Sequence, residues 1–408
     1  MESLNTRQKL AVDSVLNGEN IFITGPGGTG KSFTIKYIVN LLKENKKNYG
    51  LTATTGTASV LIGGQTINSF LGIGIGNDKI SNMVKKLKTN SGFNRLLTLD
   101  VLIIDEISML DDLMFEKISE LLSVIKGTID DNNSNKPFGG VQLILVGDFC
   151  QLAPVKGLYC FLSPVWKNLN IRNIILNELV RQSGDKLFQQ ILGIVRKGKC
   201  TDNIIAVLNS LKSTKFSNNI IPTKLYPINI DVDKINNIEI QKLKNKGNKS
   251  VLYKATLFNT NSKVNYDVEL TENSQVIVTR NIDIANGLVN GTRAIIKYLT
   301  SESVLIQKVD GDIHTINYYK DFNDLKKTSY ILHMPIKTSY ALSIHKSQGM
   351  TIDSVELDLG SNIFAHGQTY TALSRAKNLK SIKIINVDKA SFKVNPYVKK
   401  FYHDILDG

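Results

Sequence analysis

Cysteine, tryptophan and long apolar runs are scarce in this chain of 408 residues. Its three cysteines, Cys150, Cys160 and Cys200, are too few for a disulfide framework and lack the C-x-x-C spacing of a zinc site. No stretch approaches the about 18 uninterrupted apolar residues of a membrane span, and the start lacks a basic region followed by an apolar core. These absences predict a soluble, intracellular protein with no membrane partner, in which the single Trp166 is packed in a core.

Acidic residues are also in deficit. Asp and Glu number 36 against 50 Lys and Arg, which gives a net charge of +14. This excess favours a polyanionic partner, and nucleic acid is the natural candidate, although coding bias toward lysine is an alternative source of the charge. Because single cores stop growing at about 250–300 residues, the length predicts two or three domains.

The segment GPGGTGKS, residues 25–32, matches the phosphate-binding pattern G-x-x-x-x-G-K-[ST] at every fixed position. An apolar run that predicts a buried strand precedes it, and a helical pattern follows it. Glycines let consecutive N–H groups face phosphate oxygens, Lys31 is predicted to bind the β and γ phosphates, and Ser32 is predicted to bind Mg²⁺. The nucleotide-contacting residues predicted for this loop are Gly25, Pro26, Gly27, Gly28, Thr29, Gly30, Lys31 and Ser32.

The fold class predicted from the pattern is α/β. From Ile21 to about Val180, short apolar strands alternate with helices and end in polar or glycine-rich turns, which is typical of a parallel sheet. The ligand of such a sheet lies at the carboxyl ends of its strands. A polar stretch at residues 74–97 predicts a small insertion, either a wedge or a plain loop. We place the first domain at residues 1–183 and the second at 184–408, with a small β-barrel-like insertion at about residues 296–334.

Charged and amide side chains follow two of these predicted strands. Asp105 and Glu106 end the strand in VLIIDEISML, where Asp105 can hold Mg²⁺ and Glu106 can orient and deprotonate the water that attacks the γ phosphate. They would lie beside the phosphate loop if their strand neighbours the loop strand. Asp148 and Gln151 end a third strand, where Gln151 can sense the γ phosphate and Asp148 is alternatively a turn-capping residue.

Two arginines further along the chain stand in polar and apolar surroundings. Arg181 lies in NELVRQSGD and Arg375 in YTALSRAKNL. Each alone is compatible with a surface ion pair, but two guanidiniums facing one phosphate would close a cleft with ATP and open it after hydrolysis.

With these residues in view, the chain resembles the Pif-type DNA helicases of superfamily 1 along nearly its whole length. The motifs that carry the resemblance are LNTRQKLAVD, GPGGTGKS, TATTGTASVLIGGQTINSFLGIG, LIIDEISML, KPFGGVQLILVGDFCQLAPV, ELVRQ, NGLVNGTRA, YALSIHKSQGMTID and YTALSRAKNL. The resemblance implies two RecA-like motor domains around one ATP, with a small barrel-like insertion in the second. It also implies ATP-driven movement along single-stranded DNA in the 5′ to 3′ direction and unwinding of tailed, forked or structured DNA by a monomer, with single-strand-binding or replication proteins as further partners.

The resemblance also assigns roles to single residues. Gln8 would contact adenine, and Gln348 is a further nucleotide contact. Lys31, Ser32, Asp105 and Glu106 keep the roles given above, with Ser32 and Asp105 as metal ligands, while Gln151, Arg181 and Arg375 would sense the γ phosphate. The residues that it implies for DNA binding are Thr54, Gly64, Asn68, Ser69, Phe70, His345, Lys346 and Ser347, with Phe70 as a stacking surface or a core residue.

Three positions depart from the family pattern. Asn68 stands where histidine is usual, Ala153 where proline is usual, and Arg7 where an acidic residue is frequent. None of these removes a catalytic group, and Asn68 can still donate to a phosphate, so we expect altered affinity with retained activity. Two alternatives stay open: a helicase of the same superfamily that acts on RNA or on both nucleic acids, and a nucleotide-switched clamp that binds single strands without unwinding.

Overall fold

The computed structural model of the chain contains two compact units, which are described separately. The structure describes residues 4–74, 76–89, 91–178, 184–216, 222–227, 229–260, 265–280, 282–283, 286–288, 291–308, 310–322 and 328–407. The first unit comprises Met1–Ile204, Ile363–Ser374 and Lys389–Gly408, and the second comprises Ile205–Asn362 and Arg375–Asp388. Two later segments of the chain thus belong to the first unit. The predicted division between residues 183 and 184 stays a prediction.

A six-stranded parallel sheet forms the centre of the first unit, in the order β3-β2-β4-β5-β1-β6. Its strands are β1 (Asn20–Thr24), β2 (Tyr49–Ala53), β3 (Gln65–Thr66), β4 (Val101–Asp105), β5 (Gln142–Val146) and β6 (Ile171–Ile175). The predicted parallel α/β sheet is therefore confirmed for this unit.

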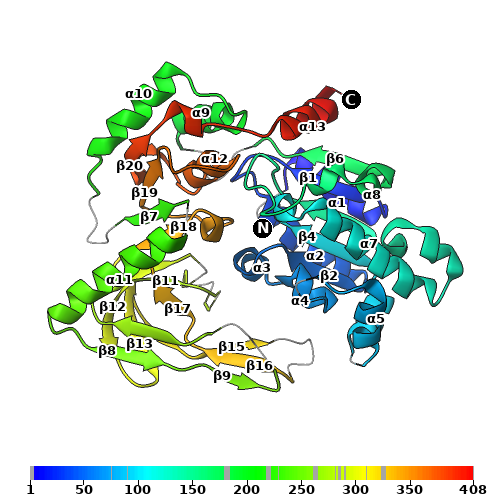
Figure 1. The fold of residues 1–408 in the computed structure, drawn as a ribbon, viewed down its shortest axis with the longest axis horizontal. Coiled ribbons are helices and arrows are strands. Elements are labelled where there is room, and N and C mark those ends of the chain that lie inside the picture. The colour runs from blue at the N-terminus through cyan, green and yellow to red at the C-terminus, as the bar shows by residue number, and fades with distance from the viewer. Residues whose placement is uncertain are drawn as a thin grey trace. The chain divides into compact units, whose positions relative to one another are not determined.

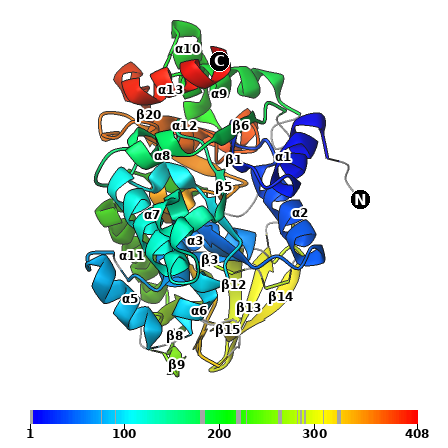
Figure 2. The ribbon, with the colours of Figure 1, turned by 90° about the vertical axis from the view of Figure 1, so that its right-hand side faces the viewer.

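Helices cover the sheet of the first unit (Figures 1 and 2). The helices of this unit are α1 (Thr6–Leu16), α2 (Lys31–Glu44), α3 (Gly56–Ile62), α4 (Ile67–Leu71), α5 (Ile80–Lys88), α6 (Gly92–Leu97), α7 (Asp112–Gly127), α8 (Pro164–Asn168), α9 (Lys186–Arg196), α12 (Gln368–Leu373) and α13 (Pro396–Asp407). The stretch predicted as a polar insertion at residues 74–97 contains α5 and α6. Helix α10 (Asp202–Ser210) spans the division between the units.

Alternation along the strands explains how the two faces of this sheet are buried. Ile21 and Ile23 on β1 belong to the apolar core shared with α1, α2 and α3. Phe22 points to the other face, where its ring lies 5.6 Å from that of Trp166 and 6.0 Å from that of Phe401 on α13. Trp166 is buried, as the sequence predicted.

The second unit has its own four-stranded parallel sheet, in the order β18-β7-β19-β20. Its strands are β7 (Thr223–Tyr226), β18 (Ala341–Ser343), β19 (Val355–Leu359) and β20 (Ile382–Val387), and α11 (Asn229–Asn245) follows β7.

Antiparallel strands fill the chain between α11 and β18. They form sheets of five strands (β14-β13-β12-β11-β17), three strands (β15-β16-β9) and two strands (β10-β8). The bounds are β8 (Ser250–Tyr253), β9 (Thr256–Phe258), β10 (Val268–Thr271), β11 (Gln275–Val278), β12 (Arg293–Leu299), β13 (Ser303–Lys308), β14 (Ile313–Asn317), β15 (Tyr319–Phe322), β16 (Tyr330–His333) and β17 (Ile336–Thr338). These antiparallel strands include the stretch at about residues 296–334, where the sequence predicted a small barrel-like insertion, and the barrel itself stays a prediction.

Candidate nucleotide site and strand-binding motifs

The phosphate loop connects β1 to α2 at the carboxyl edge of the first sheet. Gly25, Gly28 and Gly30 have φ angles of 145°, 92° and 84°, a region that L side chains rarely occupy. A Cβ at Gly25 would also lie 2.1 Å from the carbonyl oxygen of Leu176, so this position accepts only glycine. The loop thus leads into the N-terminus of a 14-residue helix, an arrangement suited to a phosphate.

Lys31 lies in the first turn of α2 and is folded onto the loop. Its Nζ donates to the carbonyl oxygens of Gly25 at 2.7 Å and Pro26 at 2.9 Å. Burial lowers the pKa of Lys31, while the carboxylates of Asp148, Glu106 and Asp105, with which it interacts, act in the opposite direction. A phosphate brought to this loop would offer Lys31 stronger, charge-assisted partners than two carbonyl groups.

The predicted acid pair ends β4. The Glu106 N–H donates to Asp105 Oδ1 at 2.8 Å, and Glu106 itself has the left-handed backbone angles φ 51° and ψ 42°. Such strain in a residue other than glycine is concentrated at functional sites in proteins. Strand β5 lies between β4 and β1, so the acid strand is not the direct neighbour of the loop strand, yet Lys31 still interacts with both acids.

Burial makes this acid pair a suitable place for a divalent cation. Burial and the negative charge of Glu106 raise the pKa of Asp105 to about 7. A bound cation would favour the ionised carboxylate by direct charge compensation. Ser32, the other predicted metal ligand, is exposed in the first turn of α2. The residues present therefore fit the Mg²⁺ that accompanies ATP.

Gln8 lies next to the phosphate loop and is almost fully buried. Its Oε1 accepts from the Asn5 N–H at 3.0 Å and its own N–H donates to Asn5 Oδ1 at 2.9 Å, so the two residues cap α1. A Cβ at Gly30 would lie 2.7 Å from Gln8 Nε2. The capping bonds hold the amide beside the loop, which is compatible with the adenine contact predicted for Gln8.

Asp148 forms the centre of a buried polar network behind the phosphate loop. Arg196 on α9 donates to it through Nε and through Nη2, both at 2.9 Å, and the hydroxyl groups of Tyr402 and Tyr370 donate at 3.0 and 3.2 Å. Burial alone would raise the pKa of Asp148, but Arg196, together with Lys31 and the Cys150 N–H, outweighs burial, and the pKa lies below its usual value. Asp148 Oδ1 also accepts from the Cys150 N–H at 3.1 Å, which is the turn-capping role that the sequence offered as an alternative. The sequence did not predict the side-chain contacts with Arg196, Tyr370 and Tyr402.

Tyr370 connects that network to the phosphate loop. Its hydroxyl oxygen accepts from the Gly27 N–H at 3.0 Å while the same hydroxyl donates to Asp148. Tyr370 is the first residue of the motif YTALSRAKNL, in which the resemblance assigns a role only to Arg375, five residues later. Arg196 and Tyr402 carry no motif signal, because they are single residues of ordinary amphipathic helices.

Gln151, the predicted γ-phosphate sensor after β5, is also buried. Its N–H donates to the Asp148 carbonyl oxygen at 2.9 Å. The backbone just before α12 approaches it closely, since a Cβ at Gly367 would lie 2.1 Å from the Gln151 carbonyl oxygen. Arg181, the second predicted sensor, lies outside the described residues, so its role stays a prediction.

The second unit brings Arg375 to the segment His345–Gln348. Arg375 is almost fully buried, and its Nη1 donates to the carbonyl oxygens of Ser347 at 3.4 Å and Met350 at 3.3 Å. Gln348 is fully buried in the same segment. Arg375, one of the predicted γ-phosphate sensors, therefore contacts the segment that contains Gln348, a predicted nucleotide contact.

Around the same segment the predicted strand-binding side chains lie among other cations. Lys346 is exposed, Ser347 is buried with its hydroxyl bonded to the Ile344 carbonyl oxygen, and burial lowers the pKa of His345. Burial also lowers the pKa of Lys337 to about 8, and the charges of Lys346 and Arg280 contribute in the same direction. Clustered positive charge of this kind is suited to a phosphate backbone.

The predicted strand-binding residues of the first unit follow β2 and differ in accessibility. Ser69 is exposed, Asn68 donates through Nδ2 to the Gly74 carbonyl oxygen at 2.7 Å, and Thr54 donates through its hydroxyl to the Glu106 carbonyl oxygen at 2.8 Å. The bond of Thr54 links this motif to the acid pair. A Cβ at Gly64 would lie 2.3 Å from the Leu51 carbonyl oxygen, so Gly64 permits close packing of backbone.

Phe70 is 6% exposed, which favours the core role that the sequence left open. A Cβ at Gly50 would meet its ring at 2.5 Å, and the Arg95 guanidinium lies 5.1 Å from the ring centroid. The ring is packed between β2 and α6 in this structure. Its use as a stacking surface for a base stays a prediction.

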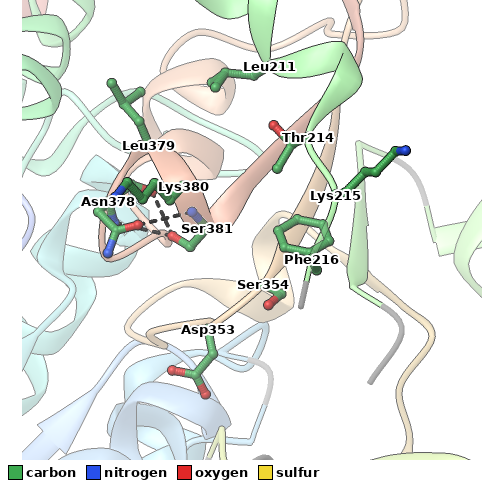
Figure 3. Close-up of a pocket in the computed structure, with 10 residues that line it drawn as sticks. All are labelled: Leu211, Thr214, Lys215, Phe216, Asp353, Ser354, Asn378, Leu379, Lys380 and Ser381. Atoms are coloured by element: carbon green, nitrogen blue, oxygen red, sulfur yellow. Dashed lines mark hydrogen bonds between the residues drawn. The ribbon is translucent and has the colours of Figure 1, made fainter. Parts of the chain in front are cut away.

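A pocket of about 590 Å³ lies elsewhere in the second unit, at the amino ends of β19 and β20 (Figure 3). It is lined by Leu211, Thr214, Lys215, Phe216, Asp353, Ser354, Asn378, Leu379, Lys380 and Ser381. The Asn378 side chain is hydrogen-bonded within its own turn, because its Oδ1 accepts from the Ser381 N–H at 3.0 Å. None of the predicted nucleotide or DNA contacts lines this pocket.

Comparison with known proteins decides the family. Residues 3–203 match the model of the PIF1-like helicase family. The crystal structure of Pif1 helicase from Candida albicans is 31% identical and has a TM-score of 0.83, covering 99% of this chain and 100% of that chain. The chain belongs to the PIF1-like helicase family. The fold is accordingly the RecA-like α/β fold of these helicases.

Two further relatives of this PIF1-like chain bear on its function. The ATP-dependent DNA helicase PIF1 of Xenopus laevis is 33% identical over 427 residues, which cover 98% of this chain and 64% of the relative. The chain thus spans just under two thirds of that relative's length. A Bacteroides Pif1 structure bound to single-stranded DNA is 25% identical with a TM-score of 0.73, covering 99% of this chain and 97% of that one.

Among the described residues, no helix is long and apolar enough to cross a membrane.

Proposed function

We propose that this protein is an ATP-dependent DNA helicase that moves 5′ to 3′ along single-stranded DNA and unwinds tailed, forked or structured duplexes. One observation carries the proposal: the phosphate loop, Lys31 and the buried acid pair Asp105 and Glu106 meet at one edge of the first sheet. The names of the relatives, which include a DNA helicase and a Pif1 bound to single-stranded DNA, support the choice of substrate.

In this proposal the chain's own residues divide the work of ATP hydrolysis. The loop N–H groups and Lys31 bind the phosphates, and Gln8 contacts the base. Asp105 and Ser32 hold Mg²⁺, which supplies charge compensation on the phosphates. Glu106 orients the attacking water and takes its proton, and Gln151, Arg181 and Arg375 report the presence of the γ phosphate.

The remaining parts of the proposal concern DNA and architecture. Thr54, Asn68, Ser69, His345, Lys346 and Ser347 contact the strand, with phosphate as the partner of their polar groups. The antiparallel strands form the barrel-like insertion, and the apolar core shared by β8, β10, β11, β12, β13, β14 and β17 supports this assignment. The protein works as a monomer.

ATP hydrolysis stimulated by a single strand tests the catalytic assignment. We expect Lys31→Ala and Glu106→Gln each to lower the stimulated rate at least about 100-fold, since the first removes the positive charge that binds the phosphates and the second removes the base that takes the proton of the attacking water. Glu116→Gln, an acid on α7 away from the loop, is the matched control and should retain the wild-type rate. Hydrolysis by Glu106→Gln near the wild-type rate would refute the assignment of the base.

A further inference from the structure

A row of aromatic side chains crosses the three-stranded sheet β15-β16-β9 of the second unit. Phe322 on β15 pairs with Tyr330 on β16, which pairs with Phe258 on β9. Directly paired residues on neighbouring strands share one face of a sheet. The rings of Phe258 and Tyr330 are stacked at 5.0 Å, and that of Phe322 meets Tyr330 edge-on at 5.8 Å. We call Phe258, Tyr330 and Phe322 the aromatic row.

The aromatic row faces solvent. Phe258 is 48% exposed and Phe322 is 37% exposed. The apolar core of the antiparallel region, which includes Ile296, Ile306 and Val278, contains no member of the row. An exposed group of large apolar side chains that no core requires marks an interaction site.

Charge is divided between the two faces of this sheet. Lys320 lies two residues before Phe322 and so shares its face, and its Nζ lies 4.9 Å from the centroid of the Tyr330 ring. Asp321 points to the opposite face, where Arg280 donates to its Oδ2 through Nε at 2.9 Å. On the described strand residues the aromatic face thus carries a positive charge and no carboxylate, which favours an anionic partner.

The position of Phe258 leaves one side of the ring stack open. Strand β9 is the edge strand of its sheet, so Phe258 ends the stack that begins at Tyr330. A planar ring can extend this stack while an anion attached to it pairs with Lys320. Nucleobases joined to phosphates combine these two features, and every base has a face that can stack.

We propose that the aromatic row and Lys320 form a second contact for single-stranded nucleic acid, separate from the motif residues His345–Ser347. A base stacks on Phe258, and a neighbouring phosphate pairs with Lys320. This contact is independent of base sequence, because neither stacking nor the phosphate reads base edges. The inference rests on the proposed function, since it assigns a further surface to the same strand.

Tryptophan fluorescence tests the contact directly. Trp166 is the single tryptophan of the chain and is buried in the other unit, so Phe258→Trp introduces one exposed reporter into the row. Leu257→Trp is the matched control, because Leu257 is 43% exposed on the same strand and points to the opposite face. A labelled oligothymidylate reports binding independently through its anisotropy. We expect saturating oligothymidylate to quench the added emission of Phe258→Trp and to leave that of Leu257→Trp unchanged.

Other outcomes would overturn the inference in distinguishable ways. Binding seen by anisotropy with unchanged emission from Phe258→Trp would refute the contact and leave the proposed function intact. Emission that changes with protein concentration alone would show that a second copy of the chain occupies the row. Absence of oligothymidylate binding by the wild-type protein would refute the proposed function, and the second contact with it.

Affinity gives a second, independent reading. Base stacking on an aromatic side chain contributes to the binding free energy, so we expect Phe258→Ala to weaken oligothymidylate binding about fivefold or more. Leu257→Ala should leave the affinity within about twofold of the wild type. ATP hydrolysis measured without a strand should be the same in both variants, which separates the contact from the nucleotide site. Equal affinities of the two variants would refute the contact.

Discussion

At the scale of single residues, Asp105 makes the stability of the nucleotide-free protein depend on pH. Its pKa rises from 3.8 to about 7 because of burial and the adjacent Glu106. Between these values the folded protein keeps a proton that the unfolded chain has released, so this group makes the free energy of unfolding fall as the pH rises from about 4 to about 7.

We therefore expect Asp105→Asn to flatten that pH dependence. The amide cannot ionise, so the loss of stability on passing from pH 5 to pH 7.5 should be smaller than in the wild type. Urea denaturation at the two pH values, without nucleotide or Mg²⁺, measures the effect. Asp404 is exposed, so Asp404→Asn serves as control and should lose as much stability between the two pH values as the wild type. The same loss of stability in Asp105→Asn as in the wild type would contradict the raised pKa of Asp105.

Tyr370 provides a second prediction at this scale. Tyr370→Phe removes the acceptor of the Gly27 N–H and one of the donors to Asp148. Because these groups are buried, we expect the free energy of unfolding to fall by about 1–2 kcal/mol. The exposed Tyr37→Phe on α2 should leave it nearly unchanged. Coincident urea midpoints for the two variants would show that the network does not stabilise the loop.

At the scale of elements, the segment that joins α3 to β3 packs closely against the backbone of β2. Gly64→Ala would place a Cβ 2.3 Å from the Leu51 carbonyl oxygen on β2. We expect it to cost about 1–3 kcal/mol of stability, as overpacking does. A Cβ at Gly56, the first residue of α3, meets open space, and alanine favours a helix, so the thermal midpoint of Gly56→Ala should equal or exceed that of the wild type. A lower midpoint for Gly56→Ala than for Gly64→Ala would reverse this explanation.

Elements also show which parts of the fold the sequence could predict. The strands β1, β2, β4 and β5 are short runs that end in polar turns. Strands β1, β4 and β5 are buried almost continuously, so their sequences are the unbroken apolar runs expected of a parallel sheet that is covered on both faces. The edge strand β6 was missed because Arg172 and Asn173 interrupt its apolar pattern. Residues 74–97 were read as a polar insertion, and their lysines concealed the helical spacing of Met83 and Leu87 in α5.

At the scale of the whole molecule, the candidate site was predictable where its residues are adjacent in sequence. Gly25–Ser32 and the pair Asp105 and Glu106 form local patterns whose chemistry can be stated without a structure. Arg196 and Tyr402 could not be predicted, because they reach Asp148 from 48 and 254 residues away and only packing brings them together. The same limit applies to the aromatic row, whose three members come from three separate strands.

For the molecule as a whole, we predict that chemical energy from ATP drives strand separation. The most direct measurement is ATP-dependent displacement of a labelled strand from duplexes with a 5′ DNA tail, a 3′ DNA tail or a 5′ RNA tail, with Lys31→Ala as control. We predict displacement from the 5′ DNA tail that Lys31→Ala abolishes, and little from the others. Displacement from the 3′ tail would contradict the direction, and ATP hydrolysis without displacement on any substrate would contradict the helicase function itself.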